Sequence, residues 1–178
     1  MFDKQYRFRG KHAMQVSDLT AQFDAESKAQ LFRRNLDVLI NAPLIGFLFG
    51  RKAEKDDAKN PNTGKVAEES VFDEQVINNK ETLEFNFKLI ILLDTEYEAN
   101  EESRVNRAFR HPGEDPADME LFDAYTRGGV EVLHEKLIEG VSDPSEYISR
   151  LYEFVEEFDE RFNEGVTSDV LLSLCTGK

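Results

Sequence analysis

The sequence has a single cysteine, no tryptophan and no long apolar run. One cysteine, Cys175, excludes a disulfide bond within the chain and fits a reducing compartment. The residues before it, 171–174, are mostly apolar, so we do not expect a reactive, low-pKa thiol. The most apolar stretches, 42–49 and 89–93, are far shorter than the roughly 20 residues of a membrane-spanning helix. The N-terminus has no apolar stretch behind its charges, so we expect no secretory signal and a cytoplasmic protein that does not bind membranes.

Motifs for metals and phosphates are also missing. The three histidines, His12, His111 and His134, lie far apart and no second histidine follows any of them at helical spacing. The acidic pairs lack the spaced oxygens and the glycine of a calcium loop. No glycine-rich loop is followed by a lysine that could hold a phosphate. We therefore expect neither a metal nor a cofactor.

Positive charge is scarce, and it exceeds negative charge only at the beginning of the chain. The chain has 22 Lys and Arg against 36 Asp and Glu, a net charge of −14. The first 52 residues nevertheless carry nine basic against five acidic residues. Basic and aromatic residues alternate at the N-terminus, a pattern that can bind a nucleic-acid backbone and stack on bases. The alternative is an arm whose aromatic rings dock on the core while its charges stay in water. The basic residues concerned are Lys4, Arg7, Arg9 and Lys11.

Apolar residues recur every three or four positions along most of the sequence, which predicts helices. We expect helices after Gly10, over 31–49, over 80–93, over 101–110, over 115–138 and over 143–162. Asp115 and Pro116 supply a typical N-cap and first helical residue, whereas Pro43 should kink or restart its helix. Residues 41–49 are apolar on nearly all sides and should be buried all round. Sustained two-residue alternation is missing, so we expect no sheet.

The predicted fold class is all-α, a single-domain bundle of five to seven helices with a long polar insertion. Residues 1–12 are expected to form a basic arm and residues 13–165 the helical domain. Residues 51–79 are the polar insertion, in which a short strand or helical turn around 71–77 stays open. Residues 166–178 are either a tail or a short docking helix.

Two adjacent glycines, Gly128 and Gly129, lie inside the helical pattern over 115–138. Each costs about 1 kcal/mol relative to alanine in a helix, so something must offset this loss. Our first interpretation is that another helix approaches closely there, namely the apolar segment 42–49. The alternative is a kink that presents Tyr125 and Arg127 to a ligand.

Three arginines, Arg104, Arg107 and Arg110, recur every third residue and should lie along one side of their helix. They are candidates for contact with a polyanion, or for pairing with the preceding glutamates within the helix. Arg104 is also followed by His111. This spacing resembles that of small all-α ribonucleases of the HEPN type, which would imply catalysis by Arg104 and His111.

One combination of segments is similar to a known family. The segment Ile45–Lys52, the polar insertion, the helix Leu121–Leu133 with its Tyr-x-x-Gly-Gly run, and an Asp-Pro start at 143 resemble the small Dnd-associated proteins. Those are encoded beside bacterial DNA phosphorothioation genes. The resemblance extends over residues 31–158. It implies a helical accessory protein in a bacterial defence system, and it supplies no catalytic residues.

Our leading functional hypothesis is a non-catalytic adaptor that binds another protein, or protein and DNA together. One alternative is the ribonuclease described above. The other is an acidic DNA mimic or inhibitor that acts through the glutamate-rich last helix. Association of identical copies and binding of RNA stay open. The binding candidates are Arg104, Arg107, Arg110, Tyr125, Arg127, Lys4, Arg7, Arg9 and Lys11.

Overall fold

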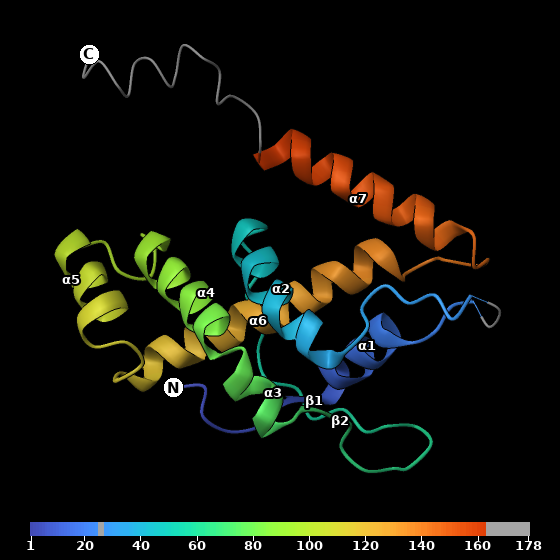
Figure 1. Ribbon diagram of the computed structural model, residues 1–178, viewed down its shortest axis with the longest axis horizontal. Helices are drawn as coiled ribbons and strands as arrows, with labels where there is room; N and C mark the ends of the chain where they lie inside the picture. Colours follow the sequence, from blue (N-terminus) through green and yellow to red (C-terminus); the bar gives the residue numbers. More distant parts are fainter. Residues whose placement is uncertain (25–26, 163–178) are drawn as a thin grey trace. The chain divides into compact units, whose positions relative to one another are not determined.

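Helices form most of the regular structure in the computed structural model, which describes residues 1–24 and 27–162 (Figure 1). Within these ranges, the predicted all-α class is confirmed. The α-helices are Gly10–Thr20 (α1), Asn35–Leu48 (α2), Asp73–Asn78 (α3), Lys80–Leu93 (α4), Glu101–Val105 (α5), Pro116–Leu137 (α6) and Glu146–Phe162 (α7). A π-helical segment, Asn106–Arg110 (η1), continues α5, and two strands, Tyr6–Arg9 (β1) and Glu68–Val71 (β2), complete the fold. None of the helices described is long and apolar enough to cross a membrane.

The chain divides into two compact units, Met1–Glu139 and Gly140–Lys178. The first unit holds every element up to α6, and the second holds α7. The predicted helical domain, residues 13–165, therefore extends over both units. Cys175 and the predicted tail, residues 166–178, lie outside the described residues.

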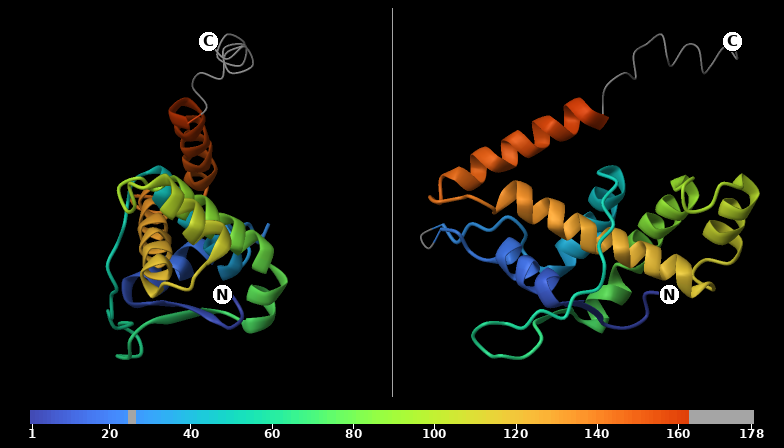
Figure 2. Two further views of the ribbon diagram at one scale, coloured as in Figure 1. Left: turned by 90° about the vertical axis from the view of Figure 1, so that its left-hand side faces the viewer. Right: turned by 180° about the vertical axis from the view of Figure 1, so that it is seen from behind.

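The core of the first unit is built around α6. Helices α1 and α2 pack against α6, and α4 packs against α2 and η1 (Figures 1 and 2). The buried side chains follow the apolar periodicity of the sequence, because the side chains three and four residues apart share one face of a helix. The fully buried ones include Val16, Leu19, Leu36, Leu39, Leu83, Phe87, Ile90, Ile91, Phe122, Val130 and Leu133.

Close approach between α2 and α6 explains the two adjacent glycines. A Cβ atom on Gly129 would overlap the carbonyl oxygen of Ala42 and would lie 2.8 Å from the backbone nitrogen of Gly46. A Cβ atom on Gly46 would in turn overlap the carbonyl oxygen of Tyr125. The predicted contact of the glycine pair with segment 42–49 is confirmed. Gly128 allows a second close contact, because a Cβ atom there would overlap the carbonyl oxygen of Arg51, just after α2.

Helix α2 differs from its prediction in two respects. It runs continuously from Asn35 to Leu48, so Pro43 does not restart it. The buried side chain of Asn86 donates a hydrogen bond of 2.8 Å to the carbonyl of Ile40, in the turn that Pro43 weakens by lacking an N–H. The expectation of burial on all sides was wrong, since Leu48 is 37% exposed. The face with the small residues meets α6, and the ring of Phe47 beside it contacts Tyr125.

A small antiparallel sheet corrects the expectation that no sheet forms. Strand β1 pairs with β2, with Tyr6 opposite Val71 and Arg9 opposite Glu68. The signal in the sequence was a four-residue alternation, in which Tyr6 and Phe8 share one side of the strand. Phe8 and Val71 are buried, so this short sheet is tied to the core. Residues 1–12 thus contain β1 and the first turn of α1, and the insertion 51–79 contains β2 and α3.

Candidate functional site

Arg104 holds the connection between α4 and α5 together. Its guanidinium donates hydrogen bonds of 2.8 to 2.9 Å to the backbone carbonyls of Leu92, Glu98 and Ala99. His111, its proposed catalytic partner, is exposed and lies 3.1 Å from Glu114. Arg104 therefore uses its guanidinium within the fold, and the structure supplies no geometry that joins it to His111.

Arg107 and Arg110 differ sharply in their surroundings. The guanidinium of Arg107 donates to Asp115 at 2.9 Å and to the fully buried Asp118 at 2.7 Å. The same carboxylate of Asp118 accepts a hydrogen bond of 2.8 Å from the hydroxyl of Tyr97. Arg110 is exposed. The three arginines therefore do not act as one stripe, because two of them are used inside the fold.

Tyr125 and Arg127 also make internal contacts. The hydroxyl of the buried Tyr125 donates to Asp94 at 2.7 Å, and Lys52 lies 3.3 Å from the same carboxylate. Burial raises the pKa of Tyr125, and its hydrogen bond to Asp94 raises it further. Arg127 is 12% exposed, and its guanidinium donates to the carbonyl of Ala53 at 2.8 Å. Arg127 thus anchors the segment after α2 to α6, and Tyr125 anchors the end of α4 to α6.

Acidic neighbours compensate most of the basic residues at the N-terminus. Arg9 lies 3.3 Å from Asp57 and 3.6 Å from Glu68. Arg7 lies 4.0 Å from Glu68, and Lys11 lies 2.8 Å from Glu131. Lys4 is exposed. Because acids from other elements pair with these charges, the N-terminal segment does not present a continuous basic surface.

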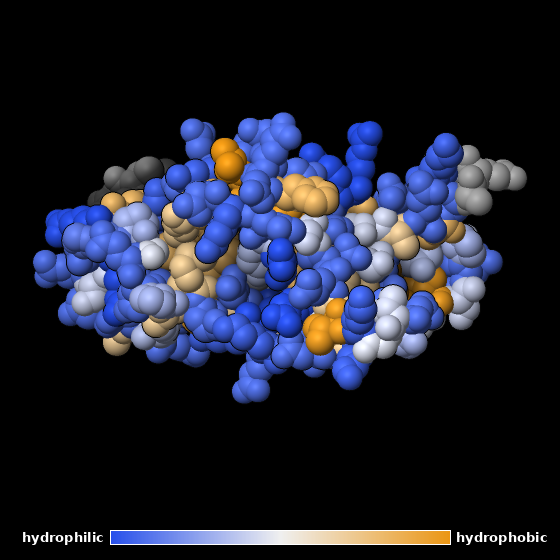
Figure 3. Space-filling model, turned by 90° about the horizontal axis from the view of Figure 1, so that it is seen from below, coloured by the Kyte–Doolittle hydropathy of each residue, from blue (hydrophilic) through white to orange (hydrophobic). Residues whose placement is uncertain are grey.

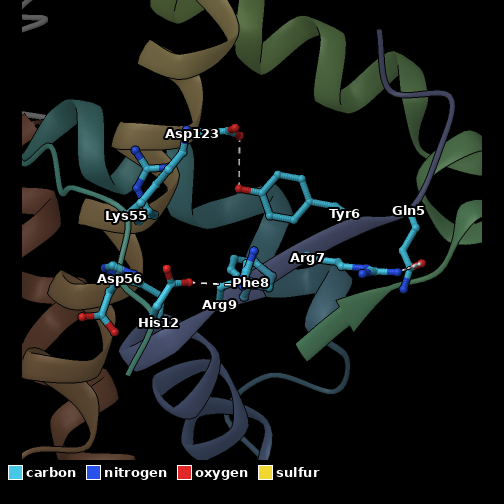
Figure 4. Close-up of a pocket in the computed structure, with 11 residues that line it drawn as sticks. Gln5, Tyr6, Arg7, Phe8, Arg9, His12, Lys55, Asp56 and Asp123 are labelled. Atoms are coloured by element: carbon cyan, nitrogen blue, oxygen red, sulfur yellow. Dashed lines mark hydrogen bonds and ion pairs between the residues drawn. The ribbon is translucent and has the colours of Figure 1, made fainter. Parts of the chain in front are cut away.

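Strand β1, the start of α1, residues 55–57 and α6 enclose a cavity of about 480 Å³ (Figure 4). Its size falls within the 300–1,000 Å³ typical of pockets for small ligands. Asp123 of α6 lies on its wall, and the hydroxyl of Tyr6 donates to this carboxylate at 3.2 Å. These two residues are 117 positions apart, so no sequence spacing could have predicted the pair.

The carboxyl group of Asp123 is electrostatically unusual. Burial raises its pKa to about 6, against the weaker opposing effects of Arg127 and of the hydrogen bond from Tyr6. Burial disfavours the charged form of an acid because the low-dielectric interior solvates it poorly. A carboxyl group with such a pKa on the wall of a cavity is a common mark of a functional site.

His12 lines the same cavity and is 1% exposed. Its Nε2 lies 3.0 Å from a carboxylate oxygen of Glu131, whereas its Nδ1 has no hydrogen-bond partner. Burial lowers the pKa of this imidazole, with the Glu131 hydrogen bond acting in the opposite direction. In the neutral form Nε2–H donates to Glu131, and Nδ1 is then a buried acceptor without a donor.

The exposed apolar residues differ between the two units. Hydrophilic residues cover most of the face that carries the sheet and α3, and its apolar groups are separate (Figure 3). In α7, by contrast, the apolar residues form one stripe and none of them is buried.

Among the described residues, no group of three or more His, Cys, Asp and Glu could hold a metal ion.

Comparison with known proteins gives no relative. No family model matches the chain, and neither a curated protein nor a solved structure matches it. The candidate site therefore depends on the geometry above alone.

The raised pKa of Asp123 leads to a prediction about stability. Its pKa is higher in the folded chain than the ordinary 3.8, so the fold loses stability as pH rises from about 4 to about 6. We expect Asp123→Asn to raise the free energy of unfolding by up to about 3 kcal/mol at pH 7.5. Asparagine avoids the buried charge and still accepts from Tyr6.

Urea unfolding of the wild type and of Asp123→Asn at pH 4 and 7.5 measures this effect. The difference between the two proteins should vanish near pH 4, where both side chains are uncharged. Asp3→Asn, an exposed substitution of the same kind, should show no such trend. A difference between wild type and Asp123→Asn that is the same at both pH values would contradict the prediction.

Proposed function

We propose that this protein is a cytoplasmic helical adaptor that binds a protein partner through the apolar face of α7, in a bacterial defence system as the family resemblance implies. The observation that carries the proposal is the amphipathic character of α7. The stripe is formed by residues at alternating three- and four-residue steps, Ile148, Leu151, Val155, Phe158 and Phe162. A helix of this length gains most of its stability from packing, so an apolar face along all of it favours binding to another surface.

Aromatic rings make this face rigid and large. The rings of Phe154 and Phe158 have centroids 6.3 Å apart, and those of Phe158 and Phe162 are 4.8 Å apart. Ile148 is 67% exposed and Tyr152 is 64% exposed. Large aromatic side chains are the residues that most often carry the binding energy of an interface.

The length and charge of α7 favour a groove on a folded partner. Its 17 residues cover little more than two heptads, whereas a coiled coil is usually sustained over three or four. The side of the helix away from the stripe is acidic, with Glu153, Glu156, Glu157 and Glu160. A second copy would bring a like charge, so the fitting partner has an apolar groove with basic residues at its rim.

The test uses the full chain as bait in an extract of the native host, followed by purification of the captured partner and calorimetric titration. We expect the double substitution Leu151→Asp and Val155→Asp to weaken binding by at least about 100-fold, because each removes an apolar anchor worth about 2 kcal/mol or more. Ser149→Asp is the matched control, because it places the same acid on the polar side of the helix. It should leave the affinity unchanged.

Two results would contradict the proposal. One is an affinity that the double substitution leaves as it was. The other is a stable dimer of the purified chain, measured by light scattering, that the double substitution separates. In that case a second copy, and not a different protein, covers the face.

A further inference from the structure

We propose that the cavity between β1, α1, residues 55–57 and α6 binds a small organic cation that carries ammonium or guanidinium groups. This function is separate from the adaptor function of α7, because every residue that lines the cavity belongs to the first unit. Three observations carry it: the balance of charge on the wall, the unused acceptors inside, and the size of the cavity.

The positive charges on the wall are already compensated. Each of the four basic residues that line the cavity has an acidic partner within 4.0 Å. These pairs are Arg7 with Glu68, Arg9 with Asp57, Lys55 with Glu120, and Arg127 with Glu120, so the four basic residues have three acidic partners. An anionic ligand would have to compete with these acidic partners for the basic residues. The cavity is therefore poorly suited to a phosphate or a carboxylate.

Two carboxylates on the wall have no ion-pair partner in the part of the chain that the structure describes. Among the described lining residues, Asp56 and Asp123 are the charged groups without an oppositely charged partner within 4.0 Å. Asp56 accepts hydrogen bonds from the backbone N–H groups of Lys11 and Ala58, and these lower its pKa, so it stays ionised. Asp123 has only the neutral hydroxyl of Tyr6 as a donor. Asp123 is half-buried, and Arg127 and Lys55 offset only part of the cost of its charge, since its pKa stays raised. A cation bound against this carboxylate would lower that cost further.

A third lining residue also carries an acceptor that is not in use. His12 lines the cavity, and its buried Nδ1 has no hydrogen-bond partner. A ligand rich in N–H donors, such as one with ammonium or guanidinium groups, can satisfy the carboxylate of Asp123 and place donors on the side of the cavity that His12 lines. The cavity of about 480 Å³ can hold a short diamine or an alkylguanidine.

Calorimetric titration of the full chain at pH 7.5 with putrescine and with agmatine tests the proposal. We expect one molecule bound per chain and at least tenfold weaker binding to Asp123→Asn. Asp3→Asn removes the same charge at an exposed position outside the cavity and should bind as the wild type does. Succinate, an anion of similar length, should not bind.

The wild type alone provides a second measurement. With a pKa of about 6 for Asp123, binding should be about tenfold weaker at pH 5 than at pH 7.5, because a proton then competes with the cation. The other titratable and charged groups that face Asp123 or line the cavity beside it are Tyr6, His12, Lys55, Glu120 and Arg127. The pKa of His12 is lowered, so its imidazole becomes protonated at a lower pH than that of an ordinary histidine.

Three results would overturn the proposal. They are failure of both probes to bind at about 10 mM, equal binding to Asp123→Asn and the wild type, and binding of succinate as tight as that of the amines. The loss of partner binding in the α7 variants has no bearing on these outcomes, since α7 contributes no residue to the cavity.

Discussion

Replacing Gly129 with alanine is expected to lower the free energy of unfolding by about 3 kcal/mol. The new methyl group would overlap the carbonyl oxygen of Ala42, which belongs to the backbone of α2 and cannot move aside as a flexible side chain can. The gain of about 1 kcal/mol in helix propensity from glycine to alanine is too small to compensate. The two helices would have to move apart at the centre of the core, where packing is densest.

Urea unfolding measures this loss, and Gly64→Ala serves as the control. Gly64 lies in a turn with φ +67°, and a methyl group added there would meet no atom within 4 Å, so only backbone strain of about 1 kcal/mol is expected. If Gly129→Ala were as stable as the wild type, the close approach of α2 and α6 would be refuted.

Replacing Arg107 with methionine is expected to cost about 3 kcal/mol, the second large effect on stability. Methionine has a similar length but no charge, so Asp118 would keep a buried carboxylate without its cation. The carboxylate already has one oxygen, Oδ2, without a hydrogen-bond partner, so little remains to stabilise it. Tyr97 would remain as its donor at 2.8 Å.

Arg110→Met is the matched control for this substitution. Arg110 is exposed and three residues further along the same helical segment, so the expected change is within about 0.5 kcal/mol. Chemical unfolding of both variants distinguishes an arginine that pairs with a buried carboxylate from one that lies in solvent. Equal stabilities would mean that the arginines form a solvent-exposed stripe, as the sequence spacing alone suggested.

The helices were largely predictable, since their signals are local. The pattern of Leu83, Phe87 and Ile90 lies within one helix and marks the buried face directly. The side chain of Asp115 accepts from the backbone N–H of Ala117, as its position before Pro116 indicated. The glycine pair gave the one long-range contact that could be inferred, because the cost of two glycines in a helix implies a close neighbour.

The strands and the roles of the arginines were harder to predict. Four residues of alternation in β1 are too few to distinguish a strand from a loop until β2, about 60 residues later, is placed beside them. The spacing of Arg104, Arg107 and Arg110 describes the side of a helix but not what lies opposite. In the fold, carbonyls from the α4–α5 connection face one of them and a buried aspartate faces another.

The sequence by itself determined the helical class, the bounds of the main helices, the α2–α6 contact and the amphipathic face of α7. These properties follow from periodicity and from residue preferences within a few turns. Only the tertiary structure decided which residues line the cavity, among them Tyr6, His12, Asp56 and Asp123. It also decided that the two aspartates have no basic partner within ion-pair distance among the described residues. The physical reason is that the energy of a charge depends on burial and on partners that approach through space, and these partners come from segments far apart in the chain.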